Sequence, residues 1–106
     1  MKEAQALLGT GELEVIDVRE PHEWLTGHIE GARLLPLGTF RQNPKAAALG
    51  DAVLFVCAAG VRSETAARLA LSHGIKRVFN LVGGTRAWAG AGLPLVREEY
   101  ASTAAE

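Results

Sequence analysis

Residues 52–57 (AVLFVC) form an uninterrupted apolar run, which is typical of a central parallel strand covered by helices on both faces. The run stops at a loop that contains Gly60. A helical pattern then extends from Ser63, a predicted N-cap, to Gly74, a predicted C′ residue. Other apolar runs, at 13–17, 32–37 and 76–82, alternate with helical patterns at 2–8, 21–27, 44–50 and 83–92. This alternation predicts an α/β domain with a mostly parallel sheet.

Length and composition are those of one soluble domain. The chain has 106 residues, 48% of them hydrophobic, so we expect a single domain over residues 1–106 with a core at about 4–96 and a polar tail at 97–106 that frays. The net charge of −1 argues against nucleic acid or a membrane surface as the main partner. The first residues lack the apolar stretch of a signal peptide, and no run approaches the roughly 20 apolar residues that span a bilayer. We therefore expect a cytoplasmic monomer.

Cys57 is the only cysteine in the sequence. It can form neither an internal disulfide nor a zinc site of the CxxC type. Its place at the end of the apolar run is where parallel sheets bind ligands. If the free N–H groups of residues 58–62 surround the sulfur, they favour the thiolate and lower the thiol pKa. The alternative is a buried cysteine that acts only as a small hydrophobic side chain.

Neighbouring residues in this loop suit such a cradle. Gly60 supplies freedom for a positive φ or a close backbone approach, and the small side chains of Ala58 and Ala59 leave the mouth open. Arg62 adds a cation that either faces an anionic ligand or pairs with a carboxylate.

The loop sequence CAAGVRS resembles the active-site loop of the rhodanese-like sulfurtransferases. Two longer segments, VIDVREPHEWLTGHIEGARLLPL at 15–37 and VFNLVGGTRAWAGAGLPL at 78–95, resemble the N- and C-terminal signatures of that family. Together the resemblance covers about residues 13–95. It implies a three-layer fold with a central five-stranded parallel sheet and helices on both faces.

The resemblance also implies a chemistry. Cys57 would be the catalytic residue, taking a sulfane sulfur from a donor such as thiosulfate and passing it from a persulfide to cyanide or a thiol. No cofactor or metal would be needed, and the partners would be small sulfur compounds or an acceptor protein in a sulfur relay. The substrate-binding loop would consist of Ala58, Ala59, Gly60, Val61, Arg62 and Ser63. Asp17 and Arg19 would support it through ion pairs near the loop.

One position departs from the family pattern. Members that act on thiosulfate often carry Arg or Lys directly after the cysteine, where this chain has Ala58. The loss of that cation should weaken attraction for a dianionic donor. The physiological donor is therefore left open.

Most other conspicuous residues are predicted to be structural. His28 lies in the family's Gly-His-Ile and should make a structural hydrogen bond, and no histidine spacing indicates a Cys–His pair. Trp24 and Trp88 are expected in the core. The glycine pair at 83–84 does not match the phosphate-binding pattern GxGxxG.

Two other functions compete with sulfur transfer. One is a phosphatase or arsenate reductase, but the Cdc25-type phosphatases of this fold place five residues between cysteine and arginine, whereas four separate Cys57 from Arg62. An arsenate reductase would also need a second cysteine. A non-catalytic rhodanese-like binding module is the other alternative, although such modules commonly lack the cysteine.

Overall fold

The computed structural model describes residues 2–11 and 13–97, and its centre is a parallel sheet. Within the described residues the sheet has four strands in the order β2-β1-β3-β4, rather than the five that the resemblance implied. The strands are β1 (Glu14–Asp17), β2 (Arg33–Leu34), β3 (Ala52–Val56) and β4 (Arg77–Asn80). A further isolated antiparallel bridge joins His28 to Val96. The α/β fold with a parallel sheet is confirmed.

Side chains of β1 and β3 alternate between two core clusters. Ile16 and Phe55 are register partners and belong to one cluster, while their neighbours Val15 and Leu54 belong to the other. Both strands are buried on both faces because successive side chains point to opposite sides of a sheet. This explains why the run at 52–57 contains no polar residue.

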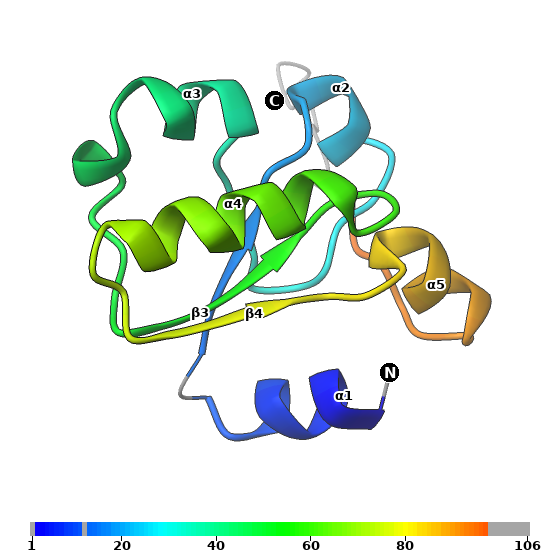
Figure 1. The fold of residues 1–106 in the computed structure, drawn as a ribbon. Helices are drawn as coiled ribbons and strands as arrows, with labels where there is room; N and C mark the ends of the chain where they lie inside the picture. The colour runs from blue at the N-terminus through cyan, green and yellow to red at the C-terminus, as the bar shows by residue number, and fades with distance from the viewer. Residues whose placement is uncertain (1, 12, 98–106) are drawn as a thin grey trace, which may run out of the picture.

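Helices cover both faces of the sheet (Figure 1). The first face is covered by α3 (Leu37–Gln42), the 3-10 helix η1 (Pro44–Ala47) and α4 (Val61–Ser72), which contribute Phe40, Ala47 and three alanines of α4. The second face is covered by α1 (Lys2–Gly9) and α5 (Gly84–Gly90), which contribute Ala4 and Trp88. A short helix, α2 (Pro21–Trp24), follows β1. The predicted three layers are therefore present.

The ends of α4 differ in part from the prediction. Gly74 has φ of 90° directly after the C-cap His73, as predicted. Ser63 is not the N-cap: Gly60, with φ of 96°, is the N-cap, and the helix begins at Val61. Ser63 is thus inside the first turn, and its side chain is free to point at the loop. The sequence pattern also did not indicate α3, whose N-cap is Pro36 and makes no side-chain capping bond.

The strand order places a topological switch point between β1 and β3. The chain moves outward from β1 to β2 on one side and from β3 to β4 on the other. Ligands of open parallel sheets bind beyond the carboxyl ends of strands at such a point. Cys57 directly follows β3, and Figure 1 shows α2 and α5 at the same end of the sheet as the start of α4.

In the described part of the chain, no helix combines the length and the apolar character that a membrane span needs. Apart from residue 97, the predicted frayed tail lies outside the described residues.

Candidate active site

The sulfur of Cys57 lies in a cradle of hydrogen-bond donors. Its Sγ accepts the backbone N–H of Gly60 at 3.1 Å and that of Ser63 at 3.4 Å. The Ser63 Oγ lies 3.3 Å from the same sulfur. The residue is only 1% exposed and belongs to a core cluster. The thiol is therefore buried as the apolar alternative requires, but its contacts are polar on the loop side.

The carbonyls of the loop point away from the sulfur. The N–H of Thr85 donates to the Cys57 carbonyl at 2.9 Å, and that of Arg86 donates to the Ala58 carbonyl at 3.1 Å. The first turn of α5 thus satisfies these two carbonyls. Of the N–H groups at 58–62 that were predicted to surround the sulfur, that of Gly60 has a hydrogen bond with Sγ, and the second backbone donor, Ser63, lies just outside the predicted range.

Two glycines make this packing possible. A Cβ on Gly84 would lie 2.2 Å from the Cys57 carbonyl oxygen, so only glycine lets α5 approach the loop. A Cβ on Gly60 would lie 3.0 Å from the backbone nitrogen of Gly83, and Gly60 has a positive φ. Gly84 therefore serves backbone packing against the cysteine loop, whereas a Cβ on Gly83 would meet Ala87 of the same helix.

The environment favours the thiolate of Cys57. Burial raises the pKa of the thiol, but hydrogen bonds from the Ser63 hydroxyl and from the N–H groups of Ser63, Ala59 and Gly60 outweigh it and lower the pKa below its ordinary value. Hydrogen bonds to the charged form have this effect. A lowered thiol pKa increases the fraction of the nucleophilic species at neutral pH.

A second layer of contacts holds Ser63. When its hydroxyl does not donate to the sulfur, it donates to Asn80 Oδ1 at 2.5 Å, and Asn80 Nδ2 donates to the Gly60 carbonyl at 3.1 Å. Sequence reasoning missed Asn80. It ends β4, next to β3, so the rule that carboxyl ends of parallel strands meet at one edge could have found it.

Arg62 takes the second of the two predicted arrangements. Its guanidinium donates to both oxygens of Glu23, at 2.6 and 2.8 Å, and so joins α4 to α2. The Arg62 hydrogen bond lowers the pKa of Glu23 to about 2 although partial burial opposes it. The same pairing raises the pKa of Arg62. Arg62 is thus tied to a carboxylate 39 residues away.

Asp17 and Arg19 form the ion pair that was expected near the loop. Arg19 donates from Nε and Nη2 to the Asp17 carboxylate, with the shortest distance 2.9 Å, and also donates to the Gly27 carbonyl at 2.8 Å. Both residues are buried, and Asp17 is level with Val56 in the sheet. The pair fixes the end of β1 beside the strand that carries Cys57, and neither side chain has a hydrogen bond with the sulfur.

A cavity of about 280 Å³ lies at the mouth of the loop, beside Ala58. Ala58 is half-buried, Ala59 and Val61 are exposed, and Val61 presents 72% of its surface. The remaining side chains that line the cavity are Arg19, His22, Glu23, Thr26, Thr85 and Arg86. Within the described part of the chain, the Arg86 guanidinium has no acidic partner and is exposed.

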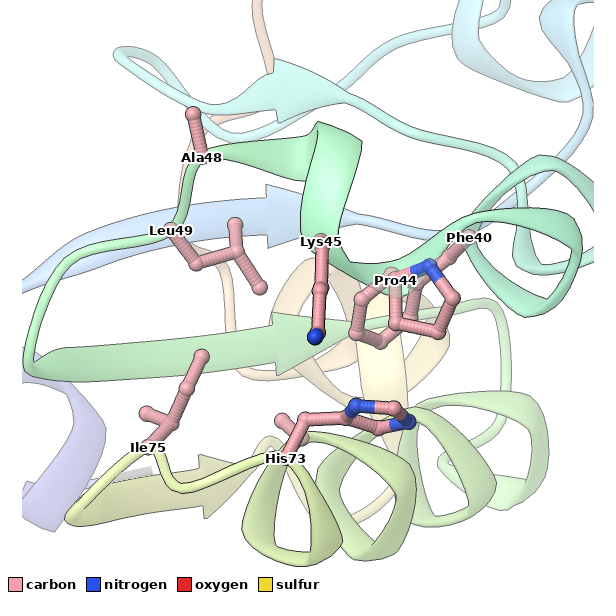
Figure 2. A pocket seen from close by; sticks show the side chains of 8 residues that line it. Phe40, Pro44, Lys45, Ala48, Leu49, His73 and Ile75 are labelled. Carbon is pink, nitrogen blue, oxygen red and sulfur yellow. The ribbon is translucent and has the colours of Figure 1, made fainter.

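The three histidines occupy three different places in the fold. His28 is buried, stacks on Trp24 with ring centroids 3.5 Å apart and bonds the Trp24 carbonyl, as a structural histidine should. His22 lines the mouth cavity. His73 lines a second cavity, of about 210 Å³, at the opposite end of α4, where Figure 2 shows it with Lys45 between η1 and the helix. No histidine in residues 2–11 and 13–97 has a hydrogen bond with Cys57.

Trp24 and Trp88 are both buried, as expected. Among the described residues, no group of three or more His, Cys, Asp or Glu side chains is arranged to hold a metal ion.

The family model for the rhodanese-like domain matches residues 1–91. The chain belongs to this family. A rhodanese-related protein of Thermoplasma volcanium has a crystal structure that superposes with a TM-score of 0.76 at 30% identity, covering 90% of this chain and 94% of that one. The likeness extends over nearly the whole domain, so the loop with Cys57 lies in the same architecture.

Several curated relatives carry functional names. A protein of Allochromatium vinosum named sulfurtransferase is 34% identical over 96 residues, which is 91% of this chain and 90% of the relative. The putative sulfur carrier protein YrkF of Bacillus subtilis is 38% identical over 78 residues, which is 74% of this chain but only 42% of the relative. The rhodanese-like domain thus has relatives that are named for sulfur transfer and sulfur carriage.

Proposed function

We propose that this rhodanese-like domain is a sulfurtransferase that carries a sulfane sulfur as a persulfide on Cys57. The observation that carries the proposal is the cradle around Sγ, in which two backbone N–H groups and a hydroxyl meet one sulfur at 3.1 to 3.4 Å. Such donors favour an anionic sulfur in a site that burial alone would keep neutral. The names of the two curated relatives agree with this function.

The reaction proceeds in two displacements. The Cys57 thiolate attacks the outer sulfur of thiosulfate, a new S–S bond forms, and the old S–S bond breaks to release sulfite. A nucleophile such as cyanide or a thiolate then attacks the outer sulfur of the persulfide, and the Cys57 thiolate leaves. Each step moves one electron pair and needs no redox cofactor or metal. The cradle stabilises negative charge on Cys57 before and after transfer.

The mouth of the loop bears on the choice of donor and acceptor. Arg62 is neutralised by Glu23, and Ala58 contributes no charge, so the attraction for a dianion such as thiosulfate is weaker than it would be with a cation at position 58. The cavity of about 280 Å³ beside Ala58 offers a place for a larger sulfane donor or for the thiol of an acceptor protein to approach the loop. We therefore include an acceptor protein in a sulfur relay among the proposed partners. We propose a cytoplasmic setting, in which a lone thiol stays reduced.

Intact-mass measurement tests the proposal directly. The reduced protein is incubated with thiosulfate or, separately, with glutathione persulfide, and then with cyanide. We expect a gain of one sulfur atom that requires Cys57 and disappears with cyanide. The Cys57→Ser variant, checked for an unchanged circular dichroism spectrum, should gain none. If the protein gains sulfur from neither donor, the proposal is overturned and a binding module is favoured. An equal gain by the variant would also overturn the proposal.

A further inference from the structure

Asn80 contacts two of the groups that surround the sulfur. Its Nδ2 donates to the carbonyl of Gly60, whose N–H bonds Sγ, and its Oδ1 accepts from the hydroxyl of Ser63, which also lies beside Sγ. Asn80 is half-buried at the end of β4, and Ser63 is fully buried. One side chain from a neighbouring strand therefore holds the loop and the hydroxyl at the same time.

The hydrogen-bond network fixes the orientation of this amide. The Gly60 carbonyl can only accept, so the NH₂ group of Asn80 must face it, and Oδ1 must face Ser63. While Cys57 is a thiol, its S–H can donate to Ser63 Oγ as the Ser63 hydrogen goes to Oδ1. When Cys57 loses its proton to solvent, the sulfur becomes an acceptor, and the hydroxyl can rotate to donate to it.

We propose that Asn80 is a positioning residue for Cys57, which holds the Ser63 hydroxyl in reach of the sulfur and accepts its hydrogen whenever the sulfur does not. A serine inside a helix can have another acceptor, the carbonyl four residues earlier. For Ser63 that residue precedes the N-cap Gly60, so without Asn80 the hydroxyl would lose the acceptor that fixes its rotamer, and the Gly60 carbonyl would lose its donor as well. Both the hydroxyl and Gly60 would then be held less firmly at the sulfur. The loss of Asn80 should therefore destabilise the thiolate.

Other charged groups around the sulfur stay in place in such a variant. Arg62 on α4 is paired with Glu23 of α2, and Arg19 is paired with Asp17 at the end of β1. On α5, the Arg86 side chain lines the mouth cavity. Because all the variants keep these groups, a change in the ionisation of Cys57 would reflect a change in the position of the Ser63 hydroxyl and of the loop.

The experiment measures the ionisation of Cys57 from the rate of alkylation by iodoacetamide against pH and from the ultraviolet absorbance of the thiolate. For Asn80→Ala we expect the midpoint of Cys57 ionisation to rise by about one pH unit, which means about tenfold less thiolate at a pH below the midpoint. Ser63→Ala should give a similar rise, and the double variant should add little to either. Asn43→Ala is the matched control, since Asn43 bonds the Ala46 N–H of η1, far from the sulfur, and it should leave the midpoint unchanged.

A midpoint that is unchanged or lower in Asn80→Ala would overturn the proposal, as would full additivity with Ser63→Ala. If Asn80→Ala does not fold, Asn80→Val supplies the same test with a side chain suited to a strand. The inference builds on the proposed function, but alkylation uses no sulfur donor. If the protein forms the persulfide but the midpoint of Cys57 ionisation is unchanged in Asn80→Ala, only the role of Asn80 is refuted. If that midpoint shifts but the protein forms no persulfide, only sulfur transfer is refuted.

Discussion

The ion pair between Glu23 and Arg62 predicts how the stability of the domain depends on pH. Arg62 lies in the first turn of α4, and Glu23 of α2 accepts two hydrogen bonds from it, at 2.6 and 2.8 Å. Folding lowers the pKa of Glu23 from its ordinary 4.5 to about 2. The folded state thus favours the ionised carboxylate, and the stabilisation is present above about pH 4.5 and is lost as the pH falls toward about 2.

The magnitude follows from the same values. A lowering from 4.5 to about 2 corresponds to about 3.4 kcal/mol at 1.36 kcal/mol per pKa unit. The two side chains are 24% and 35% exposed, so solvent screens the pair. We therefore expect Glu23→Gln to lower the free energy of unfolding by about 1–2 kcal/mol near neutral pH and by almost nothing at about pH 2.

Urea denaturation of both proteins across this pH range measures the difference. Glu64→Gln is the matched control, because it removes an acidic partner of Arg68 in an exposed pair on the same helix. It should change the free energy of unfolding by at most about 0.5 kcal/mol. A difference between the native protein and Glu23→Gln that does not shrink as the pH falls would refute the reasoning.

Three further changes have expected outcomes. Gly84→Ala places a Cβ 2.2 Å from the Cys57 carbonyl oxygen and should lower the free energy of unfolding, measured by urea denaturation, by about 3 kcal/mol or more. Gly74→Ala, with no atom within 4 Å of the Cβ, should lower it by about 1 kcal/mol because of its positive φ alone. Arg19→Met leaves the buried Asp17 carboxylate without its partner and should lower the free energy of unfolding by about 3–5 kcal/mol, and a loss as small as that of an exposed pair would contradict this account. Ala58→Arg adds a cation beside the mouth cavity and should lower the KM for thiosulfate in a cyanide assay, and an unchanged KM would mean that position 58 does not set donor preference.

The sequence was sufficient to place Cys57. The apolar run at 52–57, with a polar residue before it and a loop glycine after it, predicts a buried strand. The carboxyl end of such a strand lies at an edge of the sheet where ligands bind. The Gly60 N–H at the sulfur followed from the same reasoning, because a chain that leaves a strand and enters a helix has no ladder partners there, but the Ser63 N–H lay outside the predicted range. These predictions depend on local sequence only.

The sequence was not sufficient where a contact joins distant segments. Arg62 had two alternatives because its partner, Glu23, lies 39 residues earlier on a helix whose position depends on the whole fold. Ser63 was predicted as an N-cap because serine favours that position, but the positive φ of Gly60 starts the helix earlier. Side-chain preference could not reveal that a glycine takes the cap.

The cradle explains how one thiol can be both buried and reactive. The Cys57 side chain packs against the core, where burial raises the thiol pKa, so an apolar pocket alone would make it inert. Of the donors that reverse this effect, the Ala59 N–H shares its peptide group with the Ala58 carbonyl, which accepts the Arg86 N–H in the first turn of α5 at 3.1 Å. The close approach of α5 therefore holds this donor of the cradle directly. That approach requires glycine at position 84. A bulky side chain there should therefore impair the ionisation of Cys57 from outside the cradle, through the backbone that shapes it.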